Sequence, residues 1–185
     1  LIEAGHAVHL LTWWPYDPAP IDDFYGTALT GLPLASERRV PVLPREAFDR
    51  LPARLDLLRN ALFMRLTALA ERGVDLVVSC NNEWPGRAPA LNYVHYPARA
   101  RPRPEADRHA WYHKAPLLKA YYALSDGVAG FSSQALAGKR VLANSGWTAA
   151  WFERVHGLPA QVLYPPVAGD VPAVAWADRR DEVIS

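Results

Sequence analysis

The sequence has little cysteine, methionine and lysine, and it has no long apolar run. One of the 185 residues is a cysteine, Cys80, which excludes an internal disulfide and a cysteine-based zinc or iron–sulfur site. No apolar run approaches the roughly 20 residues that span a bilayer, and the N-terminus lacks the charged-then-apolar layout of a signal peptide. We therefore expect a cytoplasmic protein with no metal site built on cysteine.

An excess of charge of either sign is also missing. Lys and Arg together number 20, Asp and Glu number 19, and the formal net charge is +1, so no overall field attracts nucleic acid. Half of the residues are apolar and 21% are charged, which excludes a disordered, collagenous or coiled-coil chain. The length fits one to one-and-a-half globular domains.

Familiar catalytic motifs are absent. The chain has no G-x-S-x-G, no Walker loop, no H-E-x-x-H and no G-x-G-x-x-G after an expected strand. Glu83 and Asp126 are candidate bases, but a loop carboxylate is more often merely solvated. The sequence therefore indicates neither a cofactor nor a metal.

Apolar patterning alternates between strand and helix. This alternation predicts an α/β fold with a Rossmann-like parallel sheet and helices on both of its faces. The predicted strands are Ala7–Thr12, Arg39–Leu43, Val74–Val78, Leu91–Tyr96, Val141–Ala143 and Gln161–Tyr164.

Three helices are predicted between these strands. An apolar stripe from Phe48 to Leu69 predicts one long helix that ends at Gly73, with Pro52 in its first turn. The others are an aromatic helix over Trp111–Leu124 and a helix that begins after the N-cap Ser145, runs to His156 and ends at Gly157.

Both ends of the chain have the pattern of interrupted elements. The segment Leu1–His6 is typical of the last turn of a helix that ends with Gly5 at the C′ position, and Val183–Ser185 is typical of the start of a strand. We therefore expect a domain over residues 1–175, and a linker with the start of a second domain over residues 176–185.

Polar and aromatic side chains follow the predicted strands. Ligands of open parallel sheets bind at the carboxyl ends of the strands. The loops there carry amides, hydroxyls, an imidazole and flat rings, a mixture that suits a sugar or a nucleotide sugar. His95 is the sharpest candidate, because its strand stops at Pro97 and the side chain can project into the cleft. A purely structural role for His95, and a core role for most of the seven tryptophans, stays open.

The stretch Arg99–Arg108 is basic and rich in proline. It suits a contact with phosphate or with an anionic lipid surface, and it equally suits a solvated loop. A peripheral contact with the inner face of the membrane therefore remains one option.

Two motifs resemble a known family. They are Val141–Thr148, followed by Tyr164–Val167, and Asn92–Pro97 ahead of the aromatic helix. Together they resemble the N-terminal half of retaining group 1 glycosyltransferases with the GT-B fold, nearest to the mannosyltransferase type that extends dolichol-linked oligosaccharides. The resemblance runs in order along the whole chain. It implies that a first strand and a glycine-rich loop precede Leu1.

The resemblance also implies roles for particular residues. His95 matches the histidine that faces the transferred sugar and is the expected catalytic residue. The expected acceptor-binding residues are Asn81, Asn82, Trp84 and Tyr96, and those expected at the interdomain cleft are Asn144, Ser145 and Trp147.

The implied reaction transfers a hexose, with mannose as one candidate, from a nucleotide-sugar donor to a glycan or lipid-linked acceptor. The anomeric configuration is retained, and no metal or other cofactor is required. The groups that bind the donor diphosphate would lie in the second domain, so we expect the 185 residues alone to be inactive. The alternative is a noncatalytic Rossmann-like module that binds a nucleotide or a partner. Nucleic acid is not an expected partner.

Overall fold

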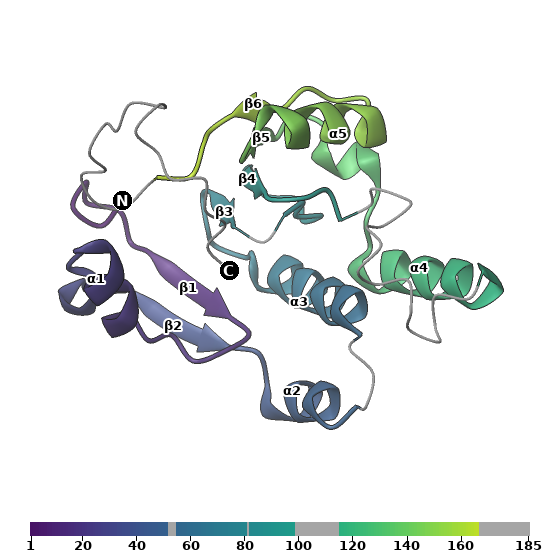
Figure 1. The fold of residues 1–185 in the computed structure, drawn as a ribbon. Helices are drawn as coiled ribbons and strands as arrows, with labels where there is room; N and C mark the ends of the chain where they lie inside the picture. The colour runs from purple at the N-terminus through teal and green to yellow at the C-terminus, as the bar shows by residue number, and fades with distance from the viewer. Residues whose placement is uncertain (52–54, 81, 99–114, 167–185) are drawn as a thin grey trace, which may run out of the picture. The chain divides into compact units, whose positions relative to one another are not determined.

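A computed structural model describes residues 1–51, 55–80, 82–98 and 115–166 (Figure 1). The chain divides into two units. The larger unit comprises Leu1–Tyr16 and Leu34–Pro165, and the smaller comprises Asp17–Pro33 and Pro166–Ser185. The predicted linker at residues 176–185 lies outside the described residues.

The larger unit is α/β, and its described strands are parallel. Strands β1 (His9–Thr12) and β2 (Ser36–Arg39) form one sheet. Strands β3 (Val77–Ser79), β4 (Ala90–Val94), β5 (Arg140–Ala143) and β6 (Gln161–Val162) form a second sheet in that order. This arrangement is consistent with a Rossmann-like fold. The expectation of one continuous sheet is corrected, because no described strand pairs with both β1 and β3.

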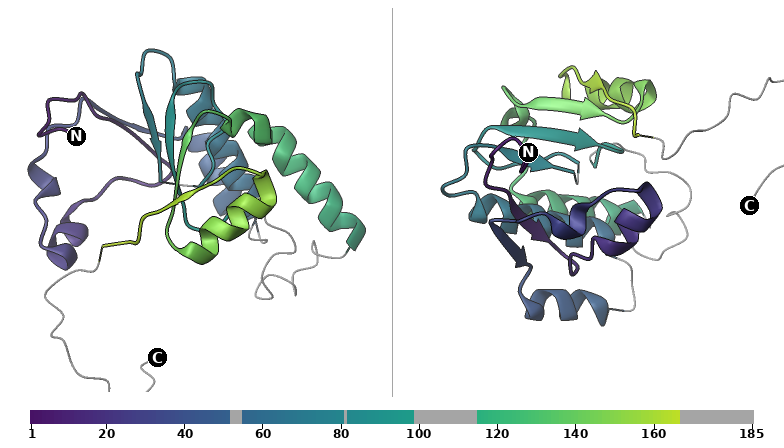
Figure 2. Two further views of the ribbon diagram at one scale, coloured as in Figure 1. Left: turned by 90° about the horizontal axis from the view of Figure 1, so that it is seen from above. Right: turned by 90° about the vertical axis from the view of Figure 1, so that its left-hand side faces the viewer.

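The described residues of the larger unit contain four α-helices. They are α2 (Val42–Asp49), α3 (Asp56–Ala70), α4 (Ala115–Ala129) and α5 (Gly146–His156), and a 3-10 turn, η4 (Ser133–Leu136), precedes β5. Helices α3 and α4 lie side by side (Figures 1 and 2), and the Tyr121 hydroxyl of α4 accepts a hydrogen bond from the backbone N–H of Leu58. Within the described residues, no helix is long and apolar enough to cross a membrane.

The core of the four-stranded sheet lies under α3 and α5. Met64 of α3 packs against Ala90, and Phe152 of α5 packs against Val94. Ala90 and Val94 are four residues apart on β4 and therefore point to the same face of the sheet. On the opposite face Tyr93 is half-buried and Val78 is 44% exposed. Helices α3 and α5 therefore pack on the same face of this sheet.

The region between β1 and α3 differs from the prediction. The residues expected as a strand at Arg39–Leu43 instead end β2 and begin α2, because Pro41 stands at the helix N-cap and Val40 is buried beside it. The single long helix expected from Phe48 to Leu69 is two helices, α2 and α3. Pro52 lies between α2 and α3 in the sequence, outside the described residues.

Other predicted elements are confirmed with small shifts. Helix α5 follows the N-cap Ser145, whose hydroxyl accepts a hydrogen bond from the Thr148 N–H, and it is followed by the C-cap Gly157, which has a φ of 67°. Strand β5 contains the predicted segment Val141–Ala143, and β6 is shorter than predicted. Of the predicted aromatic helix, the described part begins at Ala115.

The smaller unit contains a short helix, α1 (Ala19–Tyr25), and a 3-10 turn, η1 (Leu29–Gly31). The carboxylate of Asp22 joins them by accepting hydrogen bonds from both the N–H and the hydroxyl of Thr30, from the Leu29 N–H and from the Thr27 hydroxyl. These bonds stabilise the ionised form, so they hold the pKa of Asp22 well below its usual range.

Candidate functional site at the carboxyl end of the sheet

The loops that follow β3, β4 and β5 meet at one edge of the four-stranded sheet. The three strands are parallel and adjacent, so their carboxyl ends lie together. Six of the predicted site residues are connected there by hydrogen bonds or ring contacts. We call these six the strand-end cluster: Asn82, His95, Tyr96, Asn144, Ser145 and Trp147.

Asn82 connects the loop after β3 to the end of β4. Its side-chain oxygen accepts hydrogen bonds from the backbone N–H groups of His95, at 3.0 Å, and Tyr96, at 3.3 Å. Its own carbonyl accepts from the Ser79 hydroxyl at 2.9 Å. The Asn82 backbone has a φ of 60°, a left-handed conformation that asparagine tolerates better than most residues.

Thr148 connects the start of α5 to the same strand end. Its hydroxyl lies 3.2 Å from the His95 carbonyl oxygen and 2.7 Å from the Asn144 side-chain oxygen, and it donates to one of them at a time. The Asn144 N–H donates to the carbonyl of Val94. The backbone of His95 is therefore held from two neighbouring loops.

The imidazole of His95 itself remains exposed. The ring of Tyr93 meets it edge to face, with 5.0 Å between ring centroids. A side chain that is exposed while its backbone is fixed at both its N–H and its carbonyl is suited to a directed contact with a ligand.

An aromatic surface lies beside this histidine. Tyr96 and Trp147 are stacked, with centroids 5.7 Å apart and planes 28° apart, and Trp147 is 59% exposed. The ring centroids of Trp151 and Trp147 are 6.1 Å apart, and the Arg154 guanidinium lies 4.8 Å from the centroid of the Trp151 ring. Flat exposed rings next to polar groups are typical of surfaces that bind the C–H faces of sugars.

Trp84 does not join the cluster. Trp84 is 1% exposed. Its indole N–H donates a hydrogen bond to the Thr67 hydroxyl at 3.1 Å, and its backbone N–H donates to the side-chain oxygen of Asn92. Lys139 lies 4.6 Å from the centroid of the ring and donates to the Trp84 carbonyl. Burial lowers the pKa of this lysine. The described contacts of Trp84 are thus internal, whereas Asn81 lies outside the described residues.

A buried acid–imidazole pair stands next to the cluster and was not predicted. The Glu83 carboxylate lies 3.0 Å from Nε2 of His156 and accepts hydrogen bonds from the Ala98 N–H, and both side chains are at most 1% exposed. Glu83 is therefore an internal anchor for the chain after β4 and not a solvated loop acid. His156 stands at the end of α5, as predicted, but its imidazole is bound to Glu83.

The basic stretch Arg99–Arg108, a candidate contact for phosphate or anionic lipid, lies outside the described residues. In the described ranges, no group of three or more His, Cys, Asp or Glu side chains is placed to hold a metal ion.

No protein-family model, curated protein or solved structure matches this chain. The functional assignment therefore rests on the residues of the strand-end cluster and on the two sequence motifs.

Proposed function

We propose that this chain is the acceptor-side domain of a retaining glycosyltransferase with the GT-B fold. The observation that supports it best is the fixed position of His95, which Asn82 and Thr148 hold at the end of β4 while its imidazole stays exposed. This is the residue that the motif Asn92–Pro97 matches to a sugar-facing histidine.

The surroundings of His95 fit a carbohydrate ligand. An imidazole donates or accepts hydrogen bonds with hydroxyl groups, and the stacked rings of Tyr96 and Trp147 offer an apolar face beside it. A sugar presents both hydroxyls and a C–H face, so it matches both parts of the cluster. In this proposal His95 contacts the transferred hexose, and the aromatic surface binds the acceptor.

The donor nucleotide is assigned to a second domain. Charge on the leaving diphosphate requires preorganised cationic groups and backbone N–H donors. The proposal places these groups outside the 185 residues, so the chain alone is expected to bind acceptor glycans weakly and to transfer no sugar.

The experiment is an assay of the complete protein against a panel of nucleotide sugars, with glycan and lipid-linked acceptors. We expect hexose transfer with retention, and a loss of about 100-fold or more in turnover for His95→Ala with unchanged thermal stability. His6→Ala, at another exposed histidine, is the matched control and is expected to leave turnover unchanged. Inversion of the anomeric centre, or full turnover by His95→Ala, would contradict the proposal.

The alternative is a noncatalytic module that binds a nucleotide or a partner. It predicts that the complete, folded protein binds a nucleotide or partner and transfers no sugar from any donor of the panel.

A further inference from the structure

A buried acid and an exposed hydroxyl contact the same imidazole, that of His156 at the end of α5. Nε2 of His156 lies 3.0 Å from the Glu83 carboxylate, and Nδ1 lies 3.4 Å from the hydroxyl of Ser133 in η4. The side chains of Glu83 and His156 are at most 1% exposed, whereas Ser133 is exposed. An acid, an imidazole and a hydroxyl joined in this order form the arrangement that activates the nucleophile in many acyl-transfer enzymes.

The acid decides which nitrogen of the neutral imidazole carries the proton. An ionised carboxylate only accepts hydrogen bonds, so Nε2 of His156 donates to Glu83. Nδ1 of the neutral ring then has no proton, and it accepts the hydrogen bond from the Ser133 hydroxyl. The ring is therefore in the tautomer that a general base for Ser133 requires.

Neighbouring groups hold the acid and the imidazole in place. The two oxygens of the Glu83 carboxylate accept from the Ala98 N–H at 3.0 and 3.1 Å. The ring centroids of Phe131 and Phe152 lie 5.6 and 4.6 Å from that of His156, and Phe152 is buried. A base that is already oriented and shielded from water needs no reorganisation before it takes a proton.

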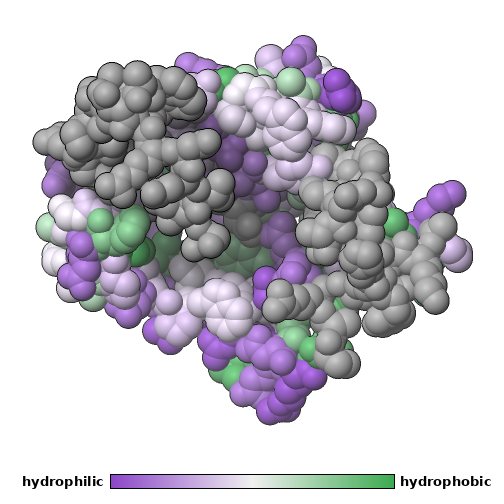
Figure 3. Space-filling view, viewed as in Figure 1, coloured by the Kyte–Doolittle hydropathy of each residue, from purple (hydrophilic) through white to green (hydrophobic). Residues whose placement is uncertain are grey.

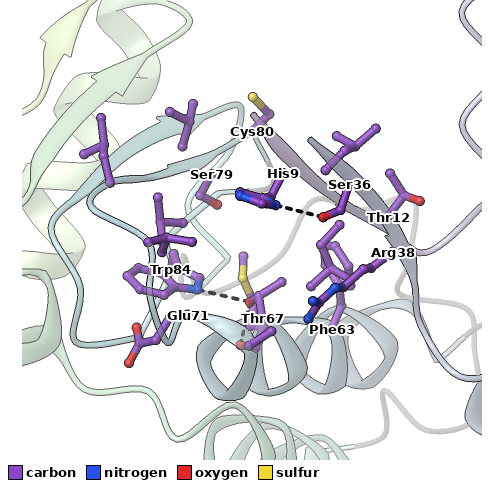
Figure 4. A pocket seen from close by; sticks show the side chains of 18 of the residues that line it. His9, Thr12, Ser36, Arg38, Phe63, Thr67, Glu71, Ser79, Cys80 and Trp84 are labelled. Carbon is purple, nitrogen blue, oxygen red and sulfur yellow. Dashed lines mark hydrogen bonds between the residues drawn. The ribbon is translucent and has the colours of Figure 1, made fainter. Parts of the chain in front are cut away.

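A reactant reaches these residues at the surface beside Ser133. In the space-filling view the molecule is hollowed near its centre, with apolar residues visible in the depth (Figure 3). A cavity of about 520 Å³ is lined by residues of β1, β3 and α3 (Figure 4), and Glu83, Ser133 and His156 are not among its lining residues. The exposed Ser133 hydroxyl is thus the point at which an electrophile meets the buried pair.

We propose that Glu83, His156 and Ser133 form a proton relay that makes Ser133 a nucleophile toward activated acyl esters. The Ser133 oxygen attacks the acyl carbon while its proton passes to Nδ1 of His156. The bond from the acyl carbon to the leaving alcohol then breaks, and Nδ1 returns the proton to that alcohol. Water hydrolyses the acyl-serine by the same two proton transfers and restores the hydroxyl. Nε2 keeps its proton throughout, and the charge of Glu83 stabilises the imidazolium.

This activity is separate from the proposed function and does not depend on it. The first test treats the complete protein with a fluorophosphonate, which forms a stable bond from the serine oxygen to phosphorus as the P–F bond breaks. Mass spectrometry of the peptides then locates the adduct. We expect labelling of Ser133 to be at least about 100-fold faster than that of Ser132, because general-base catalysis contributes about that factor or more.

Ser132 is the internal control, since it is the neighbouring residue, is also exposed, and accepts a hydrogen bond from the Ala135 N–H. Equal labelling of the two serines, or labelling of neither, would overturn the proposal.

Two surface variants test turnover. Ser133→Ala is expected to abolish the labelling and to lower the release of p-nitrophenol from p-nitrophenyl acetate by at least about 100-fold. Ser132→Thr keeps a hydroxyl for the Ala135 N–H and is expected to leave the rate unchanged. Equal rates for Ser133→Ala and the parent would show that Ser133 does not react with esters.

Glu83 acts through His156 and is therefore a positioning residue. Glu83→Gln keeps an oxygen acceptor but loses the charge, so we expect labelling of Ser133 to slow by at least about tenfold. In the parent the rate should level off with rising pH once the imidazole is neutral, whereas in His156→Gln it should keep rising with hydroxide. Unchanged rates and pH profiles in both variants would show that Ser133 reacts without the relay. The comparison of Ser133 with Ser132 uses the unsubstituted protein, so it decides the matter even where these two variants do not fold.

Discussion

The side-chain oxygen of Asn82 accepts a hydrogen bond from the backbone N–H of His95 at 3.0 Å. The same oxygen accepts from the next N–H, that of Tyr96. One amide on the loop after β3 thus sets the path of the chain where the exposed imidazole leaves β4. The position of His95 thus depends on a residue thirteen places earlier in the sequence, whose backbone has a left-handed φ.

If the proposed function is right, removing this amide is expected to reduce turnover of the complete protein without unfolding it. Asn82→Gly keeps the left-handed backbone and loses both hydrogen bonds, and two bonds of about 0.5–1.5 kcal/mol each correspond to a loss of about 5- to 150-fold. Asn82→Asp keeps an oxygen acceptor and should retain most of the rate. Steady-state kinetics of the two variants, compared at equal stability, check this.

Asn82→Ala separates backbone strain from the lost bonds. It lacks the amide as Asn82→Gly does, but alanine in a left-handed conformation costs about 1 kcal/mol more. We expect Asn82→Ala and Asn82→Gly to have the same turnover rate. The free energy of unfolding of Asn82→Ala should be lower by about 1 kcal/mol. Full turnover by Asn82→Gly would show that the amide does not position His95.

The predictions from sequence succeeded where the signal was local. Ser145 and Gly157 bound α5 because a hydroxyl at an N-cap and a glycine with positive φ act on their own helix. The carboxyl ends of adjacent parallel strands bring the loops that follow them together. The sequence could therefore predict that Asn82, His95 and Asn144 lie near one another.

The failures concern contacts between distant segments. Arg39–Leu43 has the composition of a strand, but Pro41 stands at the N-cap of α2 with the buried Val40 beside it, and a helix begins there. The division of the described strands into two sheets depends on which strands pair with one another. No periodicity within the described residues reports on that.

The Glu83–His156 pair is expected to contribute strongly to stability. The two side chains are 73 positions apart and almost fully buried, so truncating one partner leaves the other polar group unsatisfied. We expect Glu83→Ala to lower the free energy of unfolding by about 3–5 kcal/mol. Urea denaturation of the purified chain measures this change.

A double-mutant cycle shows whether the effect belongs to the pair. With His156→Ala as the second variant, residues in direct contact should couple by about 0.5–3 kcal/mol. Strictly additive effects would mean that Glu83 acts only through its bond to the Ala98 N–H.

Trp147 is expected to matter for binding far more than for folding. Its residue is 59% exposed and its ring stacks on Tyr96, so Trp147→Ala removes an exposed aromatic face at little cost to the core. We expect a change in stability within about 0.5–1 kcal/mol and a loss of at least about tenfold in acceptor affinity. Isothermal titration with acceptor glycans measures the affinity.

The matched variant Trp147→Phe keeps a flat ring over Tyr96. It should retain most of the affinity if the aromatic face is what the sugar contacts. If both variants bind acceptor glycans as tightly as the parent chain, the stacked pair of Tyr96 and Trp147 does not bind the acceptor.

Asp22 is expected to make the segment Asp17–Pro33 sensitive to acid. The hydrogen bonds from Thr27, Thr30 and Leu29 favour the carboxylate, so the pKa of Asp22 is lower in the folded segment than in an unfolded chain, where it is about 3.9. The folded form therefore binds fewer protons than the unfolded form between these two pKa values. The stabilisation is complete above pH 4 and is lost as the pH falls toward the folded pKa.

Asp22→Asn tests this dependence, because its amide nitrogen cannot accept the bonds that the Asp22 Oδ2 accepts from Thr30. At pH 7 the amides of Leu29 and Thr30 should exchange faster in this variant than in the parent chain. The difference should shrink as the pH is lowered below about 4, where the parent carboxylate begins to lose its advantage. Asp23→Asn, at the neighbouring exposed carboxylate, is the control and should leave both amides unchanged. A difference between Asp22→Asn and the parent that stays constant from pH 7 to pH 2 would show that the geometry of the turn, and not the charge of Asp22, protects these amides.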